Sequence, residues 1–105
     1  MKTLVSIPHH EYPARVRDHV EQKLRHLARF FDRIVSMRAL VERQAEVHRV
    51  ELVANVGQGV TLVVDARGEG LEATLDDALD RMGRVLRRHK TRLTDRHRRG
   101  GRTAR

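Results

Sequence analysis

Three consecutive runs of the chain alternate apolar and polar residues with a period of two. Such alternation is typical of β-strands that have one covered face and one face in water. We expect strands at 35–44, 47–56 and 60–67. The links between them are short, and the second contains Gly-Gln-Gly at 57–59, which suits a tight hairpin. The sequence therefore predicts three antiparallel neighbours that share one apolar face. The side chains expected on that face are Met37, Ala39, Val41, Val50, Leu52, Ala54, Val56, Val60, Leu62, Val64 and Ala66.

Two other segments repeat their apolar residues every three or four positions, which is the period of an α-helix. The first spans about 13–31, and Pro13 suits its first turn. The second spans about 71–93 and follows two glycines in the preceding turn. The residues expected to be buried on these helices are Val16, Val20, Leu24, Leu27 and Phe31, then Leu71, Leu75, Ala78, Leu79, Met82, Val85, Leu86 and Leu93.

A short β-rich segment at 2–7 completes the order β-α-β-β-β-α. This order predicts an α+β fold in which two helices pack on one face of a four-stranded sheet and leave the other face wet. With 105 residues the chain is long enough for one domain. We expect an α/β domain at 1–94 and a basic, disordered tail at 95–105, because the tail has almost no apolar side chains.

The charge of the chain is very unevenly distributed. Residues 1–80 carry 11 basic and 13 acidic residues, whereas residues 81–105 carry 11 basic residues and one acid, within a total net charge of +8. A helix dipole favours bases near a helix C-terminus, but this effect fades beyond the last turn. A block of one sign generally has a polyanion as its partner. We therefore expect a nucleic acid as partner, and neither a membrane surface nor a small-molecule substrate.

Helical geometry indicates that bases of the two helices form one positive surface. On the second helix, four arginines from Arg81 to Arg92 share one side. Both Phe30 and Phe31 are assigned to the core, so we expect recognition through phosphates and shape, and not through base stacking. The candidate binding residues are Lys23, His26, Arg29, Arg33, Arg81, Arg84, Arg87, Arg88, Lys90 and Arg92.

The sequence offers little for catalysis or metal binding. The chain has no cysteine, and its seven histidines form no zinc motif. Asp76 and Asp80 share a helix face, but no nucleophile or phosphate-binding loop accompanies them. We expect no enzyme activity, no metal site and no cofactor. The chain also shows no signal peptide and no apolar run near the ~20 residues of a membrane span, so we expect a cytoplasmic protein.

Two segments resemble the ribosome hibernation promoting factor family, which includes protein Y and is also known as the σ54 modulation protein family. They are KLRHLARFFDRI at 23–34 and LEATLDDALDRMGRVLRRHKTRL at 71–93, and the second is the more specific. The resemblance covers about residues 1–94. It implies a fold similar to a double-stranded-RNA-binding domain, and binding to 16S rRNA of the 30S subunit or 70S ribosome in the mRNA and tRNA channel. It further implies inhibition of translation in stationary phase or stress.

By the same resemblance the chain is similar to the short members of the family, which favour pairing of ribosomes into 100S dimers and would be monomeric off the ribosome. An alternative remains open, namely a free-standing module that binds structured RNA without a ribosome role. Double-stranded-RNA binders carry bases at the start of their last helix and in a hairpin loop. Here that helix start is acidic and the hairpin at 57–59 is uncharged, which disfavours the alternative.

Overall fold

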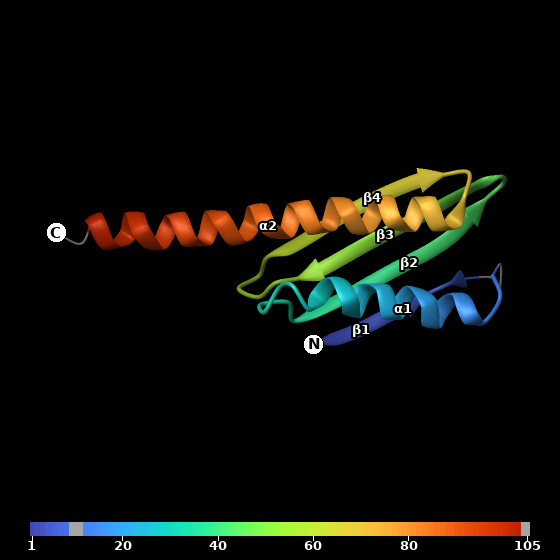
Figure 1. The fold of residues 1–105 in the computed structure, drawn as a ribbon, viewed down its shortest axis with the longest axis horizontal. Coiled ribbons are helices and arrows are strands. Elements are labelled where there is room, and N and C mark those ends of the chain that lie inside the picture. Colours follow the sequence, from blue (N-terminus) through green and yellow to red (C-terminus); the bar gives the residue numbers. More distant parts are fainter. Residues whose placement is uncertain (9–11, 104–105) are drawn as a thin grey trace.

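The structure is a computed structural model that describes residues 1–8 and 12–92 with their side chains and residues 93–103 as backbone. It confirms the predicted order of elements and the placement of both helices on the same face of the sheet (Figure 1). The elements are β1 (Lys2–Ser6), α1 (Arg15–Ala28), β2 (Ser36–Gln44), β3 (Val47–Asn55), β4 (Thr61–Gly68) and α2 (Leu71–Thr103).

The four strands form one mixed sheet in the order β1-β2-β3-β4. The pairs β2/β3 and β3/β4 are antiparallel, as predicted. Strand β1 pairs with β2 in parallel, with Lys2 opposite Ser36 and Ser6 opposite Leu40. This parallel pairing follows from the connection, because α1 crosses over the sheet between the two strands and returns the chain to the same end.

The β3–β4 hairpin confirms the role expected for Gly-Gln-Gly. Gly57 and Gly59 have φ values of 86° and 75°, which residues other than glycine rarely adopt. The Gly57 N–H donates to Oδ1 of Asn55 over 3.0 Å, and this bond fixes the start of the turn. The register then places Asn55 opposite Thr61.

The core lies between the sheet and the two helices, and it contains all of the predicted alternating residues of the three strand segments except Val60, which is partly exposed. Val5 of β1 and Ile34, which were not predicted, are also part of it. From α1, Val20 and Leu24 are fully buried, while Val16 and Leu27, and Phe31 just after the helix, pack against the core with partial burial. The buried residues of α2 are Thr74, Leu75, Ala78, Met82, Gly83 and Leu86.

Phe30 is a correction to the sequence analysis, which placed it in the core. Its side chain is 66% exposed. Helix α1 ends at Ala28, and the N–H groups of Phe30 and Phe31 then bond to the carbonyls of Leu27 and Ala28 over 3.2 and 3.1 Å. This last turn directs Phe31 toward the core and leaves Phe30 in solvent. Hydrophobicity alone does not say which of two adjacent rings faces the core.

Helix α2 is longer than predicted, because its backbone continues past residue 93 to Thr103. The sequence analysis expected a disordered tail because this segment is basic and has few apolar side chains. Arginine, however, has a high helix propensity, and each added residue extends an existing helix at low cost. The helix therefore projects beyond the sheet (Figure 1), and the extents of the molecule are 58 × 23 × 20 Å. The side chain of Leu93 lies outside the described residues, and the division into 1–94 and 95–105 stays a prediction.

The open face of the sheet is held together by one arginine among three carboxylates. The Arg49 guanidinium lies 2.7 Å from Asp65, 2.8 Å from Glu42 and 2.8 Å from Glu51. The hydrogen bonds to Asp65 and Glu42 raise the pKa of Arg49 above its usual value, despite some opposing desolvation. This network links β2, β3 and β4 on the side away from the helices.

In the described part of the chain, no helix combines the length and the apolar character needed to cross a membrane.

Candidate nucleic-acid interface

Helices α1 and α2 lie side by side and run in the same direction (Figure 1), and their first halves exchange ion pairs. His19 Nε2 lies 2.9 Å from a carboxylate oxygen of Glu72. Lys23 Nζ lies 3.8 Å from Asp76 and 4.0 Å from Glu72. The acids at the start of α2 are therefore balanced by bases of α1. Lys23, a predicted binding residue, serves this contact between the helices.

The two helices approach each other again at Gly83, which is buried. A Cβ on this glycine would lie 3.6 Å from Cδ1 of Leu27 on α1 and 3.6 Å from Nη1 of Arg87. The Arg87 guanidinium therefore lies on the α1 side of α2. His26 and Arg29 are exposed at the end of α1, and Arg33 is exposed in the connection that follows. We call His26, Arg29, Arg33 and Arg87 the α1-end cluster.

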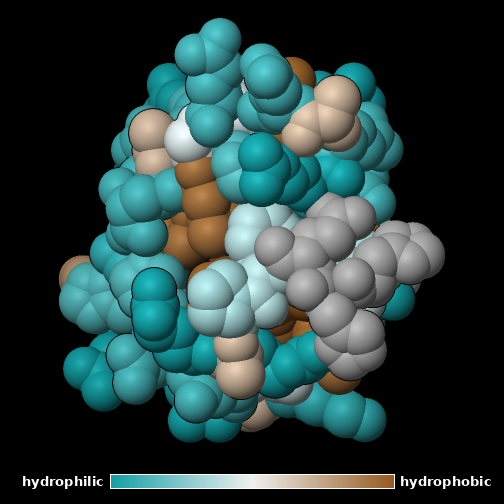
Figure 2. Space-filling view, turned by 90° about the vertical axis from the view of Figure 1, so that its right-hand side faces the viewer, coloured by the Kyte–Doolittle hydropathy of each residue, from teal (hydrophilic) through white to brown (hydrophobic). Residues whose placement is uncertain are grey.

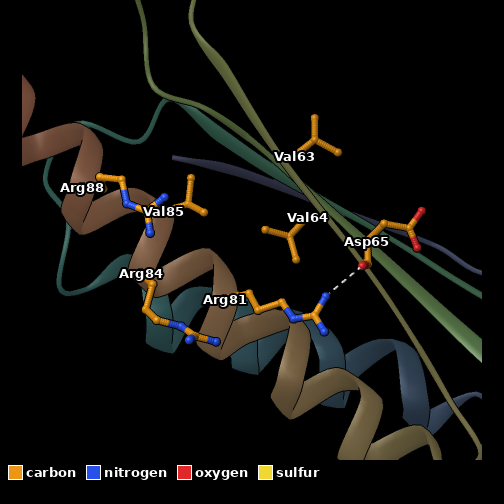
Figure 3. Close-up of a pocket in the computed structure, with 7 residues that line it drawn as sticks. All are labelled: Val63, Val64, Asp65, Arg81, Arg84, Val85 and Arg88. Carbon is orange, nitrogen blue, oxygen red and sulfur yellow. Dashed lines mark hydrogen bonds between the residues drawn. The ribbon is translucent and has the colours of Figure 1, made fainter.

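Three other arginines of α2 lie beside β4. They line a hollow of about 340 Å³ together with Val63, Val64, Asp65 and Val85 (Figure 3). Arg81 donates from Nη1 to the backbone carbonyl of Asp65 over 3.2 Å, so it also covers part of the exposed edge of β4. We call Arg81, Arg84 and Arg88 the β4-side row.

The structure separates groups that the sequence analysis merged into a single positive surface. Helix α1 packs over β1, and α2 packs over β3 and β4, so the β4-side row borders the sheet edge and not α1. At 100° per residue, Arg81 and Arg88 lie about 140–160° around the helix from Gly83, which faces α1. Among the described side chains, Arg87 and Lys90 lie about 40° and 20° from Gly83 by the same geometry, on the side of α2 that faces α1, and the other cations of α2 extend around the outside of the helix.

The cations also differ in whether the protein already provides them with an acidic partner. Arg81 lies 3.0 Å from Asp77, and Arg84 lies 3.2 Å from Asp80, both as i,i+4 pairs. Pairs this exposed contribute only about 0.3–0.5 kcal/mol, so an external anion can replace them at little cost. Within the described side chains, five exposed arginines of the predicted site form no ion pair. They are Arg29, Arg33, Arg87, Arg88 and Arg92.

The charge on α2 changes sign along its length. Its first ten residues hold four acids, and the next twelve hold six bases, which include the exposed Lys90 and Arg92. The end of the molecule at which both helices begin has a mostly hydrophilic surface with a small apolar area near its centre (Figure 2). The cationic part lies toward the opposite end, where α1 stops and α2 projects past the sheet (Figure 1).

These side chains are suited to binding an anion and show no arrangement for a reaction. Among the side chains that the structure describes, no group of three His, Cys, Asp or Glu residues could hold a metal ion. The hollow beside β4 is lined by arginines and valines, with Asp65 as its one acid. Several positive groups on a convex surface can contact the phosphates of a folded nucleic acid.

Sequence reasoning overlooked Phe30 as a surface residue of this region. Its ring stands perpendicular to that of His26, with an interplanar angle of 83° and centroids 5.6 Å apart. The signal was present in the helical spacing, because position 30 falls beside Lys23 on the flank of the helix and away from the buried stripe. The hydrophobicity of phenylalanine outweighed that signal in the prediction.

Comparisons with known proteins agree with the fold and with the resemblance. The family model described as sigma 54 modulation protein / S30EA ribosomal protein matches residues 4–94. A ribosome hibernation promoting factor from Azotobacter vinelandii is 33% identical over 81 residues, which cover 77% of this chain and 75% of that protein. One from Klebsiella oxytoca is 32% identical over 85 residues, covering 79% and 86%.

Solved structures show the same architecture. A ribosomal subunit interface protein from Coxiella burnetii superimposes with a TM-score of 0.76 at 16% identity, covering 87% of this chain and 99% of that one. The N-terminal domain of Thermus thermophilus protein Y gives a TM-score of 0.69 at 25% identity, covering 83% and 94%. With a family model that spans most of its length, the chain belongs to the sigma 54 modulation protein / S30EA ribosomal protein family.

Proposed function

We propose that this protein is a ribosome hibernation factor that acts in the cytoplasm. It binds 16S rRNA of the 30S subunit or 70S ribosome in the channel used by mRNA and tRNA. It thereby inhibits translation in stationary phase or stress and promotes 100S dimers, and it is monomeric off the ribosome. Its relatives are named ribosome hibernation promoting factors, and the family consists of binding proteins that are not enzymes.

The observation that carries this proposal is a set of exposed arginines without acidic partners, on α2 and just after α1, in a family member. Arg29, Arg33, Arg87 and Arg88 hold four positive charges that no described side chain neutralises. Such charges repel one another and favour an anionic partner. The open sheet face differs, because there Arg49 is surrounded by three carboxylates.

Obstruction is the mechanism that this surface supports. A folded body with extents of 58 × 23 × 20 Å, held through several phosphates, excludes other ligands from the space it occupies. No residue needs to react, and affinity depends on how many phosphates are neutralised. If about six phosphates are neutralised, the affinity falls by roughly three orders of magnitude between 50 and 200 mM salt.

Sedimentation tests the ribosome role directly. Purified protein is mixed with 30S subunits and with 70S ribosomes in low salt and separated on sucrose gradients. We expect the protein in the 30S and 70S fractions, and 100S particles that disappear from stationary-phase lysates when its gene is deleted. Protein that remains at the top of the gradient with both particles would contradict the ribosome role. If it still bound structured RNA, the free-standing RNA-binding module would be the better explanation.

A matched pair of variants tests the site. The first replaces Arg29, Arg33, Arg87 and Arg88 by alanine, and the second replaces four exposed arginines elsewhere. The control positions are Arg25, Arg38, Arg43 and Arg67. Both variants lose four positive charges, but we expect only the first to bind 30S subunits much more weakly. In that variant, the slope of log affinity against log salt concentration should be smaller in magnitude by about three. Equal losses in the two variants would show that net charge, and not this surface, determines binding.

A further inference from the structure

Phe30 is an exposed aromatic side chain in the middle of the cationic end of the helix layer. Its side chain is 66% exposed, more than any other large hydrophobic residue in the described part of the chain. The adjacent Phe31 packs against the core, so the fold already has a ring at this turn. The ring of Phe30 is therefore exposed to water and does not contribute to the core, which favours a role in binding.

Two contacts restrict the position of the ring. The N–H of Phe30 bonds to the Leu27 carbonyl over 3.2 Å, so the backbone of this residue is part of the helix terminus. The His26 ring stands against that of Phe30 at 83°, with 5.6 Å between centroids. A ring held in this way loses little conformational entropy when it binds a flat partner.

The groups around the ring are mostly cationic. Arg29 directly precedes Phe30 and Arg33 follows three residues later, both exposed and without an ion pair among the described side chains. The Arg87 side chain lies on the side of α2 that faces α1, next to Leu27 at the end of α1. Asp32 is the one acid in this turn. The helix terminus that carries the ring thus also carries groups that bind phosphate.

We infer that Phe30 is a stacking platform for one unpaired nucleobase of the RNA, while the arginines of the α1-end cluster bind the phosphates on either side of it. This inference rests on the proposed function, because it assigns a second mode of contact to the same RNA-binding surface. It also reverses the sequence-based expectation that base stacking plays no part. Stacking is tolerant of base identity, because every base has a π-face.

A protein partner is the competing occupant, and the surroundings of Phe30 disfavour it. The centre of a protein–protein interface is depleted of charged residues and rich in several apolar side chains. Here a single ring is flanked by exposed arginines, and the other exposed apolar residue of this connection is Val35, five positions away. One aromatic side chain among cations fits RNA, in which the apolar bases alternate with charged phosphates.

The test compares Phe30→Leu with the wild-type protein on two single-stranded oligonucleotides of equal length and charge, one normal and one abasic. Leucine keeps the apolar character and loses the flat ring. We expect Phe30→Leu to bind the normal strand about 5- to 100-fold more weakly, and the abasic strand as well as the wild type does. Leu4→Ala, which changes an exposed apolar residue on β1, is the matched control and should leave both affinities unchanged.

Phe30→Trp gives an independent readout, because the chain contains no other tryptophan. We expect the fluorescence emission of this variant to be quenched by the normal strand and by 30S subunits, but not by the abasic strand. Unfolding midpoints of all variants should stay close to that of the wild type, since the substituted ring is exposed. Wild-type affinity of Phe30→Leu for the normal strand, together with unquenched emission of Phe30→Trp, would overturn the inference.

The outcomes also separate this inference from the proposed function. Normal binding of Phe30→Leu to 30S subunits, with unquenched emission of Phe30→Trp, rejects stacking and leaves the ribosome role standing. A photoreactive aromatic residue at position 30 that crosslinks on 30S subunits only to ribosomal protein also rejects stacking and identifies a protein contact. A crosslink to 16S rRNA supports stacking. Wild-type protein that binds neither 30S subunits nor the oligonucleotides rejects both.

Discussion

The connection from β4 to α2 determines where the arginines of α2 lie, and one glycine in it can be tested by substitution. Gly68 is the last residue of β4, and Thr74 lies in the first turn of α2. A Cβ at position 68 would stand 2.6 Å from Oγ1 of Thr74. Thr74 is only 3% exposed, and its hydroxyl donates to the Gly70 carbonyl over 2.6 Å. In Gly68→Ala, therefore, either Thr74 rotates and loses this bond or the whole connection shifts.

The magnitude follows from two opposing terms. A buried hydroxyl that loses its hydrogen bond costs about 1–3 kcal/mol. Replacing glycine by alanine recovers about 0.4–1 kcal/mol, because the unfolded chain loses conformational freedom. We therefore expect Gly68→Ala to lower the free energy of unfolding by about 1–2 kcal/mol. For a domain of this size, that corresponds to a fall in Tm of roughly 4–15 °C.

Urea unfolding of a double-mutant cycle with Thr74→Ala tests the stated cause. Without the Thr74 hydroxyl the clash is gone, so Gly68→Ala should then be neutral or slightly stabilising. The cycle should give a coupling energy of at least about 1 kcal/mol. An equal loss of stability in both backgrounds would show that the Thr74 contact is not the reason. Wild-type stability of the single variant would refute the reasoning altogether.

Three further substitutions test other contacts by the same unfolding measurement. Gly83→Ala should stabilise α2 by about 0.5–1 kcal/mol, because its new Cβ would make only ordinary contacts at 3.6 Å; a loss of stability would mean that the helices cannot tolerate a methyl group there. Arg49→Met should cost about 1–3 kcal/mol, with a discount because these groups are 18–39% exposed, since it leaves Glu42 and Glu51 without their ion-pair partner and Asp65 with Arg67 alone. Glu42→Gln should cost less, and the reverse order would contradict the network. Tyr12→Phe removes the 2.6 Å hydrogen bond to His48 Nδ1 and should cost about 0.5–1.5 kcal/mol, and an unchanged midpoint would show that this bond contributes nothing.

Local patterns were enough to predict most of the fold. Alternation with a period of two identified β2, β3 and β4, and the short links between them made antiparallel pairing the simplest arrangement. Apolar residues at helical spacing identified the buried sides of both helices. These predictions succeeded because side-chain period is a property of the local backbone. The parallel partner of β1 was not predicted, since it depends on how α1 crosses the sheet.

The surface was predicted less completely than the core. Phe30 and Phe31 have the same side chain and adjacent positions, and the end of α1 at Ala28 decides which of them is buried. Likewise, the acids Asp77 and Asp80 are visible in the sequence, but only the folded structure shows that Arg81 also bonds to the Asp65 carbonyl of β4. Helix ends and contacts across elements depend on tertiary packing, which no local period encodes.

The sequence by itself determined that the chain forms a sheet covered by two helices and that its positive charge collects on the second half of the last helix. Only the tertiary structure decided where each of those charges lies. The rotation of α2 about its axis is fixed by residues such as Leu75 and Met82, which are buried against the sheet. That rotation places Arg81 and Arg88 beside β4 and Arg87 on the side of α1, because side chains on a helix keep fixed angles to one another while their surroundings depend on packing.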